Sequence, residues 1–196
     1  AIASSSEHKT PKIAIVIDDL GLSAAKLHAV KKLPSKVTLA FLPYGEAVEE
    51  MAQQSAKSGY EVILHMPMEP ENKQLDLGPA PLLTSAAVAQ NEQRLRAALA
   101  KSTDFVGVNN HMGSKLTAEA EKLAFMWPIL RDKQLFFLDS VTNPNSKAYQ
   151  AAKIAGIPAA RRDVFLDHLP GIDNAKRALQ QLERVANRQG YAIAIG

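Results

Sequence analysis

The stretch "IAIVIDDLG", residues 13–21, joins five consecutive apolar residues to two adjacent aspartates and a glycine. An apolar run of this kind is typical of a parallel strand that is buried on both faces. Burying a carboxylate carries a large desolvation cost, and two neighbouring carboxylates also repel each other. One aspartate would serve as the cap of a following helix. Two in succession indicate a bound cation or a proton that is moved.

Six further β-rich segments follow along the chain, at residues 36–42, 60–66, 104–109, 134–139, 156–160 and 191–196. Helical patterns lie between them at 45–59, 84–102, 117–133 and 172–190. We expect the second and third of these helices to begin at Thr or Ser N-caps, and the first and last to end at glycine. Alternating strands and helices predict an α/β fold of serial βα units. A barrel of about seven parallel strands and an open doubly wound sheet both fit this pattern.

The chain has 196 residues, which is enough for one large domain with a full core. We therefore predict a flexible N-terminal tail over residues 1–11 and a single domain over residues 12–196. The tail reads "AIASSSEHKT" and resembles the end left by signal-peptide cleavage. This resemblance predicts a periplasmic or otherwise exported protein, and a start chosen in cloning is the alternative.

Several classes of protein are disfavoured by composition. The net charge is only +3, and Lys and Arg are scattered among acids, so we expect no nucleic-acid partner. No apolar run approaches the roughly 20 residues that span a bilayer, so we expect no transmembrane segment. Cysteine is absent, so any metal must be held by His, Asp or Glu. The oligomeric state cannot be read from these features.

Polar residues follow five of the predicted strands, and either architecture would gather them at the carboxyl ends of the sheet. They are Asp18, Asp19, His65, Glu69, Asn110, His111, Ser114, Asp139, Ser140, Arg162 and Asp163. Two neutral imidazoles and a carboxylate are a common ligand set for zinc or another divalent first-row ion. Each residue alone has a plainer interpretation, as a helix cap, a core histidine, a turn residue or a surface ion pair. The prediction of a site therefore depends on their occurring together.

The segments "IAIVIDDLG", "GYEVILHMPMEP", "GVNNHMGS", "LFFLDS" and "RDVFLD" occur in this order between residues 13 and 167. In this respect the chain resembles the polysaccharide deacetylase superfamily, and within it the divergent branch of exported bacterial proteins. The resemblance implies a distorted (β/α) barrel with fewer than eight βα units. It also implies that Asp18 is the catalytic base, that Asp19 and His65 bind a divalent metal, and that zinc is the favoured ion.

The chain departs from the superfamily pattern at two places. A second histidine normally follows the first by four residues, and here that position is Glu69. The divergent branch carries His111 instead, which we take as the third ligand, while Glu69 could coordinate directly or through water. Related proteins also continue past the last strand with a His-Pro motif, so the domain is expected to be truncated at its C-terminal end.

These residues predict a metal-dependent hydrolase that removes N- or O-acetyl groups from an envelope carbohydrate. Asp139 or Arg162 would position the base or the substrate. Asn110, Ser114, Ser140 and Asp163 are candidates for supporting or substrate contacts. The rival is a non-catalytic metal- or glycan-binding protein that keeps the barrel, which the change at Glu69 favours. A serine hydrolase of the α/β type is disfavoured, because no G-x-S-x-G motif occurs.

Overall fold

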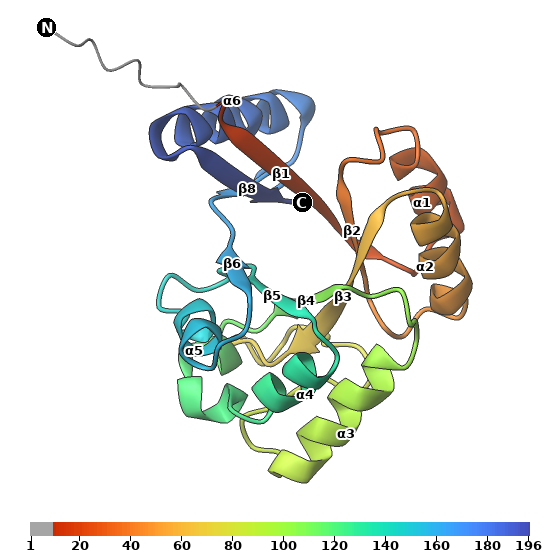
Figure 1. Ribbon diagram of the computed structural model, residues 1–196, viewed down its shortest axis with the longest axis vertical. Coiled ribbons are helices and arrows are strands. Elements are labelled where there is room, and N and C mark those ends of the chain that lie inside the picture. Colours follow the sequence, from red (N-terminus) through yellow and green to blue (C-terminus); the bar gives the residue numbers. More distant parts are fainter. Residues whose placement is uncertain (1–9) are drawn as a thin grey trace, which may run out of the picture.

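Eight parallel strands form one curved sheet in the computed structural model, which describes residues 10–196. The strands are β1 (Lys12–Leu20), β2 (Thr38–Phe41), β3 (Glu61–Met68), β4 (Gly107–Met112), β5 (Phe136–Asp139), β6 (Ala159–Arg161), β7 (Val164–Phe165) and β8 (Tyr191–Ile195). Their order in the sheet is β6-β5-β4-β3-β2-β1-β8-β7 (Figure 1). The predicted α/β class and barrel-like architecture are confirmed, in the form of a parallel-strand half-barrel.

The sheet has eight strands where about seven were predicted, because the segment after α5 (Ala148–Ile154) contributes two short strands. β6 pairs with β5, and β7 pairs with β8, at opposite ends of the sheet order. Only Arg162 and Asp163 separate β6 from β7. The backbone N–H of Arg162 donates to Asp139 O (2.9 Å), and that of Asp163 donates to Ile193 O (2.8 Å). This one stretch therefore ties the two ends of the curved sheet together.

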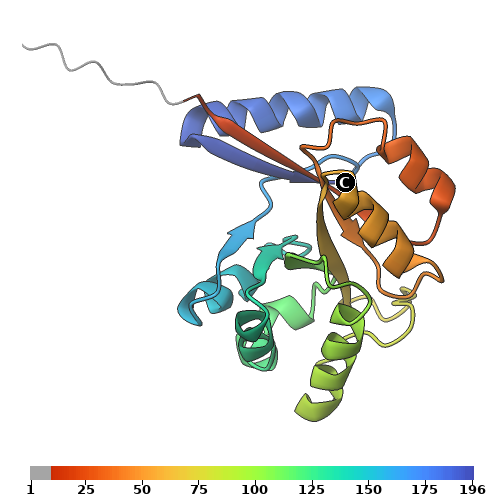
Figure 2. The same ribbon diagram turned by 45° about the vertical axis from the view of Figure 1, so that its right-hand side comes forward.

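Helices flank the sheet. They are α1 (Ala24–Val30), α2 (Val48–Lys57), α3 (Val88–Leu99), α4 (Met126–Asp132), α5 and α6 (Ile172–Gln189), with two short 3-10 turns, η1 (Leu116–Ala118) and η2 (Ala120–Leu123). Figure 2 shows α6 lying along β1 and β8, while α3, α4 and α5 lie beside the opposite part of the sheet.

The predicted Thr or Ser N-caps are wrong. The N-cap of α3 is Ala87, and that of α4 is Phe125, because the residues before α4 form the two 3-10 turns instead. The predicted glycine end of α6 is confirmed, since Gly190 adopts the left-handed conformation and its N–H donates to Ala186 O (2.8 Å).

Both faces of the sheet are buried, which explains the continuous apolar runs. The face toward the helices carries Phe41, Leu64, Met66 and Phe137, and the ring of Phe137 meets that of Trp127 edge-on at 5.4 Å. The concave face carries a smaller cluster of Val16, Ala40, Ile63, Leu138 and Ile195. Because side chains alternate along a strand, His65 lies on the same face as Ile63, inside the curve of the sheet.

Residues 1–9 lie outside the described residues, and with them most of the tail predicted over residues 1–11. In the part of the chain that is described, no helix combines the length and the hydropathy that crossing a membrane requires.

Candidate metal centre

A cavity of about 210 Å³ opens at the carboxyl ends of the central strands. Its lining residues are Asp18, Asp19, His65, Asn110, His111, Met112, Ser140, Thr142, Phe165 and Asp167. The side chains come from β1, β3, β4 and the segments that follow β5 and β7. The structure thus brings Asp18 and Asp19 together with His65 and His111 at the edge of the sheet where they were expected.

The backbone conformation at the end of β1 explains how two adjacent aspartates can share one site. In a regular strand neighbouring side chains point to opposite faces. Asp19 instead has a φ of 53°, in the left-handed region, and the register between β1 and β2 shifts between Ile17 and Leu20. As a result Oδ2 of Asp18 and Oδ1 of Asp19 lie 3.5 Å and 3.4 Å from the same atom, Nε2 of His65.

Three ligand-type atoms form a tight triangle at the centre of the cavity. Oδ1 of Asp19 lies 3.4 Å from Nε2 of His65 and 3.0 Å from Nδ1 of His111. The two imidazole nitrogens lie 3.1 Å apart. A tetrahedral zinc ion with bonds of 2.0–2.1 Å separates its ligand atoms by roughly 3.3–3.4 Å. The triangle is therefore close to the size that such an ion requires.

The donor set itself also fits a cation. Oδ1 of Asp19 is buried and has no hydrogen-bond partner of acceptable geometry, which is costly for a carboxylate oxygen. The group Asp19, His65 and His111 satisfies the spatial requirement for holding a metal ion. Such an ion would bind Oδ1 of Asp19, which has no hydrogen-bond partner within the described residues. The residues present therefore fit a divalent metal site.

A hydrogen bond to a neighbouring strand orients His65. Its Nδ1 lies 2.9 Å from Oδ1 of Asn109, in a pair that is fully buried. An amide oxygen only accepts, so Nδ1 donates to it, and in the neutral imidazole Nε2 then presents its lone pair to the cavity. The amide Nδ2 of Asn109 in turn donates to Oγ of Ser140 (3.2 Å). Supporting contacts of this kind are typical of histidines that bind metals.

The two aspartates have different electrostatic environments. Burial raises the pKa of Asp18, and the charges of Asp19 and Asp167 raise it further against the opposing effect of His65. By contrast, the adjacent imidazoles of His111 and His65 hold the pKa of Asp19 well below its usual range. Asp19 therefore remains ionised as a ligand must, whereas Asp18 has the weaker acidity that suits a proton acceptor.

Two other predicted residues, Asn110 and Ser140, line the cavity and fix its shape. Oδ1 of Asn110 accepts from the backbone N–H of Ser140 (2.8 Å), and its Nδ2 donates to Met112 O (2.7 Å). Met112 has a positive φ of 52°, and its carbonyl also accepts from Oγ1 of Thr142 (2.8 Å). These bonds tie the end of β4 to the segment after β5.

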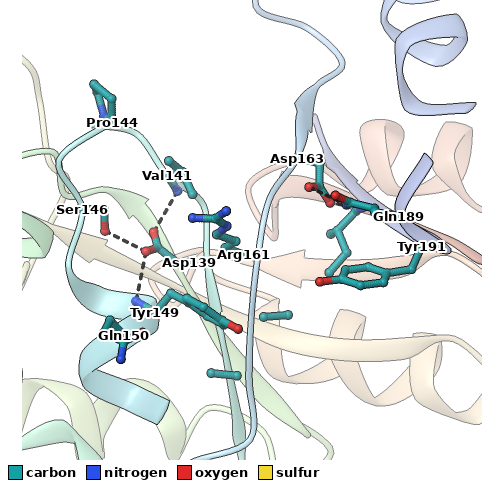
Figure 3. A pocket seen from close by; sticks show the side chains of 13 residues that line it. Asp139, Val141, Pro144, Ser146, Tyr149, Gln150, Arg161, Asp163, Gln189 and Tyr191 are labelled. Carbon is teal, nitrogen blue, oxygen red and sulfur yellow. Dashed lines mark hydrogen bonds between the residues drawn. The ribbon is translucent and has the colours of Figure 1, made fainter. Parts of the chain in front are cut away.

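Asp139 and Arg162 lie beside the cavity without lining it. The carboxylate of Asp139 accepts from Val141 N (2.9 Å), Tyr149 N (3.1 Å) and Oγ of Ser146 (2.7 Å), as Figure 3 shows. The Arg162 guanidinium donates to the carbonyls of Ser140 (2.6 Å) and Val141 (2.7 Å). Both residues therefore shape the segment that carries Ser140, and their catalytic assignment stays a prediction.

Asp139 instead borders a larger cavity of about 550 Å³, which also reaches Tyr149, Arg161 and Tyr191 (Figure 3). It lies between β6 and the first half of β8, where the sheet ends are not paired. Asp163 sits at its edge, with Oδ2 accepting from Ile193 N (2.9 Å) and Oδ1 from Gln189 (3.0 Å). The structure thus gives Asp163 contacts across the join of the sheet.

Glu69 and Ser114 hold the loop that follows β3. The Glu69 carboxylate accepts from the backbone N–H (2.6 Å) and hydroxyl (2.7 Å) of Thr84 and pairs with Nζ of Lys115 (2.7 Å). Oγ of Ser114 accepts from Glu71 N (2.9 Å). Neither residue lines the cavity. His111 is brought beside His65 from β4, where it stands opposite Pro67 in the strand register.

Asp167, Phe165 and Thr142 line the cavity but were not singled out from the sequence. Asp167 and Phe165 belong to the segment "RDVFLD", whose acidic end repeats the pattern of an aspartate after an apolar pair. The strand that precedes Asp167, β7, has only two residues and gives no periodic signal. Site residues are predicted from their position just after a strand, so Asp167 cannot be predicted when β7 itself is not.

Comparisons with known proteins identify relatives of the chain. The model of a family described as divergent polysaccharide deacetylase matches residues 15–196. The chain is 36% identical over 195 residues to the uncharacterized protein YibQ of Escherichia coli K12, and 32% identical over 196 residues to an uncharacterized protein of Haemophilus influenzae. It spans 61% and 70% of the lengths of these relatives, and all of it is covered in both.

Two solved structures have similar folds. The uncharacterized protein ATU2773 of Agrobacterium tumefaciens C58 superposes with a TM-score of 0.91 at 32% identity, covering 97% of this chain and 78% of that one. A putative cellobiose-phosphate cleavage protein of Enterococcus faecalis V583 gives a TM-score of 0.63 at 16% identity, covering 95% and 80%. The second likeness concerns the fold alone.

Proposed function

The chain belongs to the divergent polysaccharide deacetylase family, and from this premise we propose that it is a metal-dependent hydrolase acting on a carbohydrate of the cell envelope. The reaction would be the removal of an N- or O-acetyl group. Zinc is the ion that we expect, held by Asp19, His65 and His111. The observation that carries the proposal is that Asp18 faces the same imidazole as the ligand Asp19 without belonging to the ligand triangle.

The chemistry follows from the residues in the cavity. When bound, a divalent ion supplies Lewis acidity, which acidifies a water molecule and polarises an acyl oxygen. Asp18 would accept the proton of the attacking water on its carboxylate. Burial raises the pKa of Asp18 in the metal-free site, which favours this role, and the charge of a bound ion would act in the opposite direction. By accepting from Nδ1, Asn109 favours the tautomer of neutral His65 whose Nε2 carries the lone pair that a metal would bind.

Residues beside the cavity would act by positioning. Arg162 and Asp139 hold the carbonyl and N–H groups of residues 140 and 141, so Ser140 and Thr142 face the substrate from a fixed segment. A displacement of about 1 Å in such groups can lower a rate by about a hundredfold. Glu69, Ser114 and Asp163 would contribute through the loop and the sheet join that they stabilise.

An exported location is part of this proposal, since it would place the protein beside an envelope substrate. The expected partner is a glycan. Nothing in the charge distribution favours a nucleic acid, and the number of copies in solution stays open.

The test is acetate release by the full chain, loaded with zinc, from an N-acetylglucosamine oligomer and from an O-acetylated xylan. The proposal predicts release that stops with chelator and returns with added metal. If the protein binds metal and glycan but releases no acetate from either substrate, the non-catalytic binding role replaces the hydrolase. If it binds neither metal nor glycan, both interpretations fail.

A further inference from the structure

The cavity at the proposed metal centre is lined by acidic and neutral groups. Three carboxylates face it, those of Asp18, Asp19 and Asp167, and its other lining residues are uncharged or imidazoles. None of the described residues that line it is a lysine or an arginine. Even with a divalent ion bound to the ligand triangle, the three ionised carboxylates leave one formal negative charge.

Two described cations on segments beside the cavity, Arg162 and Lys115, contact other protein groups. The Arg162 guanidinium donates to the carbonyls of Ser140 and Val141, and its central carbon lies 3.6 Å from the centroid of the Phe165 ring. Lys115 is paired with Glu69 outside the cavity. Neither side chain lines the cavity.

Asp167 differs from the other two carboxylates. It lines the cavity yet is exposed, it does not belong to the ligand triangle, and within residues 10–196 no side chain or N–H donates a hydrogen bond to its carboxylate. The negative charge of Asp167 nevertheless contributes to raising the pKa of Asp18. A carboxylate that neither binds the metal nor stabilises a neighbouring segment remains available to an incoming molecule.

We infer that Asp167 makes the cavity selective against sugars that carry a negative charge beside the acyl group. The inference rests on the proposed function for the identity of the ligand, and it adds the charge class that the site accepts. Neutral or amine-bearing sugars are accepted, whereas a carboxylate or phosphate next to the acyl group is repelled by Asp167 and finds no cation to replace its hydration.

Two sugars that differ by one carboxylate-bearing lactyl group provide the test. N-acetylglucosamine is neutral, and N-acetylmuramic acid is the same sugar with a lactyl ether that bears a carboxylate. Binding of each to the zinc-loaded full chain is measured by ligand-observed NMR, which requires no turnover. We expect the neutral sugar to bind about tenfold more tightly at low salt, and the ratio to fall as salt screens the charges.

The variants isolate the charge of Asp167. Asp167→Asn should lower the ratio of the two affinities by about five- to tenfold, and Asp167→Lys should lower it further, because the substitutions remove and then reverse one charge. Asp167→Glu should preserve the ratio. Glu183→Gln removes the same charge from the exposed side of α6 and should leave the ratio unchanged.

The outcomes separate this inference from the hydrolase proposal. An unchanged ratio in Asp167→Asn, or no preference for the neutral sugar in the wild type, overturns the inference even if acetate is released. If the affinity ratio shifts as expected but the protein releases no acetate, the inference about Asp167 is supported and only the hydrolase proposal fails.

Discussion

Nδ1 of His111 lies 3.0 Å from Oδ1 of Asp19, although the two residues come from strands that are separated by two others in the sheet. The contact spans the concave face because Asp19 takes a left-handed conformation at the end of β1 and His111 extends from the end of β4. His65, on β3, completes the triangle between them.

The first prediction concerns the metal. His65→Ala removes one corner of the triangle, so zinc should no longer be retained at one ion per chain after dialysis, as measured by elemental analysis. His28→Ala is the matched control, since His28 is exposed on α1 and does not line the cavity. Full zinc content in folded His65→Ala protein would contradict the ligand assignment.

Asn109 should matter for affinity rather than for stoichiometry. Asn109→Ala frees the Nδ1 proton of His65 to move, so the affinity for zinc should fall by about 10–100-fold in a chelator competition. Asn91→Ala provides the control, because Asn91 is equally buried and bonds only to the backbone of Leu83. An equal loss in both variants would indicate general destabilisation and not an effect on the histidine.

A substitution at Glu69 tests whether its carboxylate stabilises the fold or binds the metal. Three charge-assisted hydrogen bonds reach it, so Glu69→Gln should lower the free energy of unfolding by about 1–3 kcal/mol at pH 7, measured with urea. Zinc content should not change. Loss of zinc from the folded variant would place Glu69 in the ligand set.

The same pair predicts a pH dependence. Burial raises the pKa of Glu69, but the bonds from Lys115 and Thr84 outweigh burial and leave the pKa below its ordinary value of about 4.5. A depressed pKa stabilises the fold at pH values above the ordinary pKa, and this contribution is lost as the pH falls through the folded-state pKa. The difference in unfolding free energy between wild type and Glu69→Gln should therefore shrink on acidification below about pH 4.5.

Much of this arrangement could be predicted from the sequence, since apolar runs locate seven of the strands and parallel strands place their carboxyl ends at one edge. That logic found Asp18, Asp19, His65 and His111. It could not find Asp167, because β7 is too short to produce a periodic pattern. Nor could it find the role of Thr84, which the sequence offers as a helix cap but whose N–H and hydroxyl both donate to Glu69, just after β3.

The roles of neighbouring residues were the hardest to predict. Asp139 follows a strand as a site residue should, yet its oxygens are used by Val141, Ser146 and Tyr149. The local sequence is the same for a carboxylate that faces a cavity and one that holds a loop. The role depends on which face of the sheet the side chain points to, and a shift of one residue in strand register moves the side chain to the other face.

The most direct test of the central claim compares Asp18→Asn with Asp19→Asn in the zinc-loaded full chain, measuring bound zinc and acetate release on the same samples. If Asp18 is the proton acceptor and Asp19 the ligand, Asp18→Asn keeps its zinc while its turnover falls by roughly 10²–10⁴-fold, and Asp19→Asn loses the zinc itself. Undiminished turnover in Asp18→Asn, or full zinc retention in Asp19→Asn, would contradict this division of roles.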